Sequence, residues 1–250
     1  MFLLEIIPSH HNQSPGHTHR TRAGSNGWTR RGRGVAGVPL VPMSSARLAR
    51  VLAFAAISCS VIAQSASPNI LIVYHTETKH TRALAEAIAD GAKKTSANVK
   101  CQSITDTSVE EDVLDWADAF ILGSPVHYGN PSSNVLAWFE TDWVHFWTDP
   151  RLENKVGAVF ATGGGLAQGL EHVLSGLQRL LESFRIQVLT PSPTGSAYSS
   201  YGAVAVTGTP PFNASEGVAD VFADAGRTLG AFVAAKARLQ STVGFPSSIV

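Results

Sequence analysis

Three threonine hydroxyls at short spacing follow an apolar run at residues 70–74. These are Thr76, Thr78 and Thr81, and a helix-forming stretch, 82–91, comes directly after them. The first N–H groups of a helix have no partner within the helix, and the helix dipole favours an anion at that end. The hydroxyls and N–H groups together predict a phosphate site. The alternative is that the threonines only form a turn and cap the helix.

Two further loops of small and polar residues follow apolar stretches later in the chain. One spans residues 124–130 and contains His127, Tyr128 and Gly129; the other begins with four residues, 162–165, of which three are glycine. Tyr128 can pack on a flat ring, and Gly129 lets the main chain approach one closely. His127 could donate a proton or a hydrogen bond to a bound molecule. Ordinary mobile loops also contain such residues, which is the alternative for both.

The elements that must position these loops alternate between strand and helix. Strand-like apolar stretches lie at 70–74, 98–104, 118–123, 155–161 and 185–189. Helix-like stretches lie at 81–92, 109–116, 169–184 and about 215–239, with another beginning at 132 or 133, while 190–209 reads as irregular. Such alternation predicts an α/β fold with a doubly wound, five-stranded parallel sheet, helices on both faces and right-handed crossovers.

The three loops follow the first, third and fourth predicted strands, so they should meet at one edge of the sheet. In doubly wound sheets ligands bind beyond the carboxyl ends of the strands, where the strand order reverses. No GxGxxG follows the first strand, which disfavours a dinucleotide-binding fold, and no GxxxxGK[ST] marks a nucleotide triphosphatase.

Charge is distributed unevenly along a chain whose formal net charge is zero. Residues 1–63 contain seven arginines and one acidic residue, so the remainder carries a net charge of −6. A mildly acidic domain lacks the basic surface that nucleic acids require, and no nucleic-acid partner is expected. The two cysteines, Cys59 and Cys101, form no CxxC or Cys/His cluster, and no metal site is expected.

The N-terminal quarter does not resemble part of the fold. Residues 8–42 mix His, Arg, Gly, Ser and Pro without apolar periodicity, which predicts that residues 1–42 are a disordered or mis-called extension. Residues 43–66 have a basic start, 13 apolar or small residues at 51–63 and small residues at the end, as in a signal peptide starting at Met43. This predicts a mature domain at 67–250, without a stable membrane span, that is secreted, in the secretory pathway or periplasmic. An organellar or cytoplasmic location is the alternative.

Residues 69–240 resemble the flavodoxin superfamily, and most closely its WrbA-type NAD(P)H:quinone oxidoreductases. The spacing of Thr76, Thr78 and Thr81 is similar to that of the family's flavin-phosphate loop, the loop 124–130 to the one along the isoalloxazine ring, and 161–165 to a third flavin loop. The resemblance implies FMN contacts from Thr76, Glu77, Thr78, Lys79, His80, Thr81, Pro125, Val126, His127, Tyr128, Gly129, Asn130, Thr162, Gly163, Gly164 and Gly165.

The resemblance also implies an activity. Trp147 falls where the family has an active-site tryptophan, so His127 and Trp147 are the catalytic candidates. The expected reaction transfers two electrons from NAD(P)H, through flavin N5 in ping-pong order, to a quinone or another small electron acceptor. A flavodoxin-like electron carrier without its own substrate, and a flavodoxin fold that has lost its flavin, are the alternatives. A homodimer and a homotetramer both stay open.

Overall fold

The computed structural model describes residues 67–105, 111–153, 155–191 and 201–243, in which strands and helices alternate. The strands are β1 (Asn69–Tyr74), β2 (Asn98–Ser103), β3 (Ala119–His127), β4 (Asn130–Pro131), β5 (Val156–Gly163), β6 (Gln187–Val188) and β7 (Ala203–Val206). The helices are α2 (His80–Lys94), α3 (Glu111–Trp116), α4 (Ser133–Trp138), α5 (Leu170–Ser183) and α6 (Asp220–Val243). Short π and 3₁₀ turns, η1 (Phe139–Trp143), η2 (Val144–Phe146) and η3 (Pro150–Leu152), connect α4 toward β5. The predictions for residues 1–66 lie outside the described part.

The sheet has the strand order β2-β1-β3-β5-β6, and neighbours along this path are parallel. Ile72 at the centre of β1 lies opposite Cys101 of β2 on one side and Ile121 of β3 on the other. After β1 the chain therefore forms β2 on one side of β1, and then crosses over to form β3 on the other side. The strand order reverses between β1 and β3, where such sheets bind ligands.

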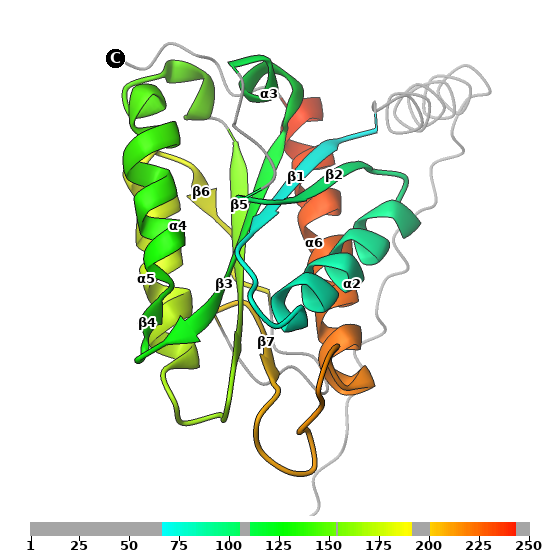
Figure 1. Ribbon diagram of the computed structural model, residues 1–250. Helices are drawn as coiled ribbons and strands as arrows, with labels where there is room; N and C mark the ends of the chain where they lie inside the picture. Colours follow the sequence, from blue (N-terminus) through cyan, green and yellow to red (C-terminus); the bar gives the residue numbers. More distant parts are fainter. Residues whose placement is uncertain (1–66, 106–110, 154, 192–200, 244–250) are drawn as a thin grey trace, which may run out of the picture. The chain divides into compact units, whose positions relative to one another are not determined.

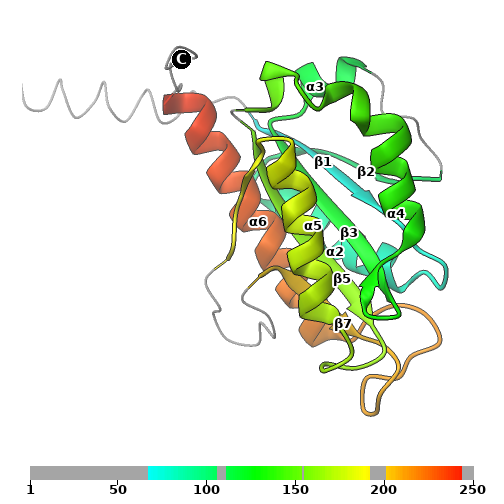
Figure 2. The ribbon, with the colours of Figure 1, turned by 90° about the vertical axis from the view of Figure 1, so that its left-hand side faces the viewer.

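Helices cover both faces of the sheet, as the alternation predicts. Figures 1 and 2 show α2 and α6 on one face and α4 and α5 on the other. The apolar run of β1 is buried, with Ile70, Leu71 and Ile72 all fully shielded from solvent. This burial on both faces explains why the run shows no alternation of polar and apolar residues.

Two glycines allow α2 and α6 to pack backbone against backbone. A methyl group on Gly91 would overlap the carbonyl oxygen of Arg227, and one on Gly230 would overlap that of Ile88. Because α6 supports α2 over this contact, the N-terminus of α2 has a fixed place at the edge of the sheet.

The prediction of five strands is incomplete at two places. The fifth position of the sheet is split, because β6 pairs with Val156 and Gly157 of β5, whereas β7 pairs with Phe160 to Gly163 further along the same strand. The stretch 190–209, expected to be irregular, thus contains β7. In addition β3 continues to His127 and forms an antiparallel hairpin with β4, so the expected loop 124–130 is mostly strand.

No helix among the described residues is long and apolar enough to span a membrane.

Candidate functional site

Side chains and backbones from three loops meet at the carboxyl ends of β1, β3 and β5. The Thr81 and Thr162 hydroxyls, both buried, lie 2.8 Å apart and join the first loop to the third. His127 Nε2 lies 3.4 Å from Glu77 Oε2 and joins the second loop to the first. The structure thus brings the predicted phosphate loop and the two predicted ring loops together at one edge of the sheet.

The first loop has a buried hydroxyl without a partner. Oγ1 of Thr76 is shielded from solvent, and no hydrogen-bond partner for it lies among the described residues. Leaving such a group unpaired costs about 1–3 kcal/mol, so native structures rarely leave one without a purpose. Thr78 is exposed, and neither an acidic residue nor a capping side chain occupies the first turn of α2. An unpaired hydroxyl beside uncapped helix N–H groups suits an anion.

Lys79 gives the first loop an unusual backbone. It precedes α2 with φ of 67°, in the left-handed region that non-glycine residues seldom adopt. Its ammonium lies 2.7 Å from the carboxylate of Glu216, and Nδ1 of His80 lies 2.6 Å from the carbonyl oxygen of Gly217. The loop before α6 is therefore attached to the first loop. The side chains of Lys79 and His80 are thus bound to this loop, and the hydrogen bond from Lys79 lowers the pKa of Glu216.

The second loop is a tight hairpin between β3 and β4. Tyr128 and Gly129 form its turn, both with positive φ, 51° and 80°, which matches the twist of the flanking strands. The side chain of Tyr128 is fully exposed at the tip. Pro125 and Val126 are half-buried in β3, while Asn130 donates from Nδ2 to the carbonyl oxygen of Tyr128. The hairpin presents an aromatic ring at the edge of the site.

The third loop packs against the hairpin through glycine. A methyl group on Gly169, at φ of 95°, would lie 2.6 Å from Cα of Gly129, so only glycine permits this approach. The side chain of Val126 likewise fills the space that a methyl group on Gly163 would need. The close approach holds the third loop against the hairpin, next to the position predicted for a flat ring.

The carbonyls of the third loop are used by the segment after β7. The carbonyl of Gly163 accepts from Thr207 N, and that of Gly164 accepts from Gly208 N and the hydroxyl of Thr209. Gly165 is buried and Gly164 is exposed. The carbonyls of Gly163 and Gly164 are therefore engaged within the chain.

His75 is a site residue that the sequence did not reveal. It follows β1 directly, is 3% exposed, and accepts at Nε2 from the side-chain amide of Asn134 at 2.9 Å. Its ring packs edge to face on that of His127. Burial lowers the pKa of His75, against an opposing effect of Glu77. The only feature of the sequence that could have indicated His75 is its position directly before Thr76. Its contact with Asn134 could not be foreseen, because α4 is distant in sequence.

Trp147 does not join the other predicted residues. Its indole N–H donates to the carbonyl of Ser183, and its own carbonyl accepts from the guanidinium of Arg185. Helix α5 starts beside the carboxyl end of β5 and ends at Ser183, so Trp147 lies at the opposite edge of the sheet. The structure therefore does not bring Trp147 together with the three loops, and its catalytic role stays a prediction.

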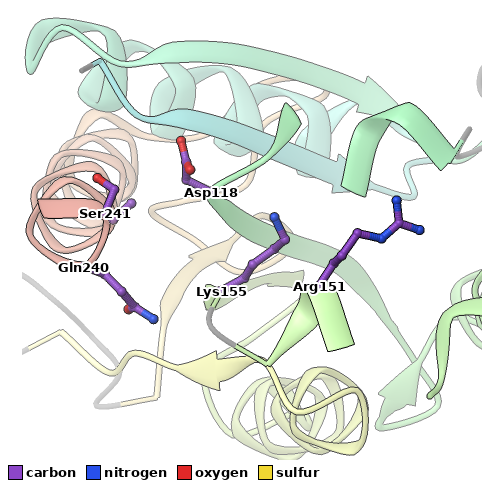
Figure 3. A pocket seen from close by; sticks show the side chains of 6 residues that line it. Asp118, Arg151, Lys155, Gln240 and Ser241 are labelled. Carbon is purple, nitrogen blue, oxygen red and sulfur yellow. The ribbon is translucent and has the colours of Figure 1, made fainter. Parts of the chain in front are cut away.

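A polar cavity of about 210 Å³ also lies at this opposite edge (Figure 3). Its lining includes Asp118, Arg151 and Lys155. Arg151 is paired with Asp149 and Asp115, and Lys155 donates to the carbonyl of Ala117. Burial lowers the pKa of Lys155. These charges are engaged in joining α3 to the sheet, so the cavity does not compete with the three loops as a ligand site.

No cluster of three or more metal-binding side chains occurs among the residues that the structure describes.

Comparison with known proteins supports the fold and identifies the family. The flavodoxin family model matches residues 72–191. The chain is 30% identical over 167 residues to the NAD(P)H dehydrogenase (quinone) of Archaeoglobus fulgidus, covering 57% of this chain and 87% of that protein. It is 29% identical over 144 residues to the flavodoxin of Aquifex aeolicus, covering 57% and 76%.

A solved structure gives the same result in three dimensions. The WrbA-like flavodoxin from Agrobacterium tumefaciens superposes with a TM-score of 0.54 at 27% identity, covering 70% of this chain and 99% of that one. The chain belongs to the flavodoxin family.

Proposed function

We propose that this chain binds FMN at the three loops and transfers two electrons from NAD(P)H to a quinone or a similar small acceptor. The observation that carries the proposal is the buried, unpaired hydroxyl of Thr76 beside the uncapped N-terminus of α2. A phosphate oxygen would satisfy both the hydroxyl and the helix N–H groups. The residues present therefore fit the phosphate end of FMN.

The other two loops fit the flat end of the same cofactor. Residues 125–130 would border one side of the ring, with Tyr128 free to fold onto it because nothing in the described structure holds its side chain. Thr162 and the glycines at 163–165 would border the other, where backbone N–H groups can reach polar ring atoms. When bound, FMN would supply the hydride and electron chemistry that amino-acid side chains lack.

His127 has the position of a proton donor for the acceptor. Its ring is about one-third exposed, and its Nε2 lies 3.4 Å from Oε2 of Glu77. A quinone that gains two electrons must also gain two protons. A protonated His127 at the rim would donate one of them to a quinone oxygen, while bulk water supplies the other.

Similarity to the Archaeoglobus enzyme supports the oxidoreductase, whereas nearly equal similarity to the Aquifex flavodoxin supports an electron carrier as the second candidate. Steady-state kinetics separates them. The purified, FMN-loaded chain is mixed with NADH or NADPH and a benzoquinone, with free FMN at the same concentration as the control. The enzyme predicts turnover far above the control with parallel double-reciprocal lines, and turnover equal to the control would favour the carrier.

We also propose that residues 43–66 are a signal peptide and that the mature chain is exported. Mass spectrometry of the N-terminus after expression in a secreting host tests this. A mature N-terminus near residue 64–67 is expected, and an intact Met1 or Met43 in the exported or retained protein would contradict it.

A further inference from the structure

A pair of histidines lies where β1 and β3 diverge, and the proposed chemistry does not use one of them. His75 is 97% shielded from solvent, yet Nδ1 of its ring has no hydrogen-bond partner among the described residues. Thr76, the next residue, has the second unpaired buried side-chain atom of this loop. Two consecutive residues thus leave polar atoms unsatisfied at the point where the fold binds ligands.

Asn134 determines which ring nitrogen of His75 carries the proton. Its amide nitrogen donates to Nε2 at 2.9 Å, so Nε2 is an acceptor and the proton of the neutral ring resides on Nδ1. Burial lowers the pKa of His75, which favours the neutral ring. The unsatisfied atom is therefore an N–H donor in a place that water does not reach, and its natural complement is a hydrogen-bond acceptor.

The second histidine covers the first. The His127 ring packs edge to face on His75 with centroids 6.2 Å apart, and it is itself held by Glu77 at 3.4 Å. The side chains of His127 and Glu77 are 30% and 59% exposed, so this outer pair can move without disrupting the core. His75 is fixed and buried, whereas its cover is attached from the surface.

We propose that His75 is a binding residue for the flavin, which it contacts by donating from Nδ1 to an acceptor atom of the cofactor, with Asn134 as its positioning residue. This inference rests on the proposed function. In the free protein the ring of His127 packs on that of His75, and the Glu77–His127 pair moves outward to the rim of the site when the cofactor binds. The acceptor belongs to the part of the flavin that lies between the first loop and the hairpin, because His75 precedes the threonines of the first loop and its ring packs on His127 of the hairpin.

Two substitutions by amide side chains distinguish which ring nitrogen of His75 donates the hydrogen bond. In asparagine the amide nitrogen is attached to Cγ, as Nδ1 is, whereas in glutamine it lies one atom further out, near the place of Nε2. His75→Asn therefore retains a donor at the inferred position, and His75→Gln offers one only at the other. Both variants are neutral and polar, so each serves as the control for the other, and thermal unfolding checks that both fold.

FMN affinity is measured by flavin fluorescence quenching for the full-length wild-type chain and both variants. We expect His75→Asn to bind FMN within about twofold of wild type and His75→Gln about tenfold more weakly, as for one lost hydrogen bond. Equal affinities for the two variants would overturn the inference while leaving the proposed function intact. Failure of the wild type to bind FMN would overturn both.

Nitrogen-15 spectra of histidine-labelled protein supply a readout independent of affinity. The His75 ring should show the Nδ1–H tautomer in the free protein, and its Nδ1 resonance should shift on FMN loading. Asn134→Leu should mix the two tautomers. An Nδ1 resonance that FMN leaves unchanged would indicate that a trapped water satisfies the donor, and would contradict the assignment.

Discussion

The hydrogen bond between the Thr81 and Thr162 hydroxyls should hold the first and third loops together. The oxygens lie 2.8 Å apart, and the two side chains are only 1% and 3% exposed. Thr81→Val keeps the shape of the side chain and removes its hydroxyl. The hydroxyl of Thr162 is then left buried without this partner.

The magnitude follows from the burial of the pair. A buried polar group that loses its partner destabilises the fold by about 1–3 kcal/mol, whereas replacing both partners by apolar groups of the same shape is nearly neutral. Thr81→Val and Thr162→Val should each lower the free energy of unfolding by about 1–3 kcal/mol. The double variant should lose less than the sum, with a coupling energy of roughly 1–2 kcal/mol.

Urea unfolding followed by tryptophan fluorescence measures these differences. With a slope of about 2 kcal/mol per molar urea, each single variant should lower the midpoint by roughly 0.5–1.5 M. Thr228→Val is the control, because the hydroxyl of Thr228 is exposed on α6 and bonds only to its own helix. Additive losses within about 0.5 kcal/mol, or single variants as stable as the control, would refute the buried hydrogen bond.

Three further perturbations have clear expected outcomes. The pKa of His75 is lowered in the folded state, so the unfolded chain binds more protons below about pH 6.5. The free energy of unfolding should therefore fall as the pH drops below about 6.5, by up to about 1.4 kcal/mol per pH unit. His75→Asn should remove this part of the pH dependence, measured by urea unfolding at a series of pH values. Gly169→Ala should lower the unfolding temperature more than Gly129→Ala does. Both glycines have positive φ, but only a methyl group on Gly169 would collide with a backbone. Equal decreases in unfolding temperature would contradict the close approach of the third loop to the hairpin. Gly230→Ala should lower the free energy of unfolding by roughly 1–3 kcal/mol through overpacking against α2, despite alanine's better helix propensity, and a stabilised variant would show that the two helices are further apart.

Local pattern was enough to predict most of the sheet. The apolar run 70–74 and its equivalents at 118–123 and 155–161 are buried strands, because a strand covered on both faces needs apolar side chains at every position. The missed strand, β7, is only four residues long and lies in a stretch rich in proline, serine and glycine. Its pairing with β5 depends on tertiary contacts that no local pattern encodes.

The parts of the site that lie in loops directly after predicted strands could be predicted from the sequence. The parts that depend on contacts between residues far apart in the chain could not. The three loops converge because parallel strands end at one edge, which the alternation alone implies. The role of His75 depends on Asn134, 59 residues away, and on the ring of His127. Trp147 was placed by the family resemblance, but the π and 3₁₀ turns after α4 take the chain to the other edge. Such turns carry no clear sequence signature.

Binding of FMN compared with riboflavin, in wild type and in Thr76→Val, tests the central claim most directly. The Thr76 hydroxyl has no partner in the described structure, so the valine variant should be as stable as wild type. A hydrogen bond to a charged phosphate contributes about 1.5–3 kcal/mol, so the variant should bind FMN roughly 10- to 100-fold more weakly, with unchanged affinity for riboflavin, which lacks the phosphate. A wild-type chain that does not bind FMN, or a valine variant that binds it as tightly as wild type, would contradict the phosphate site.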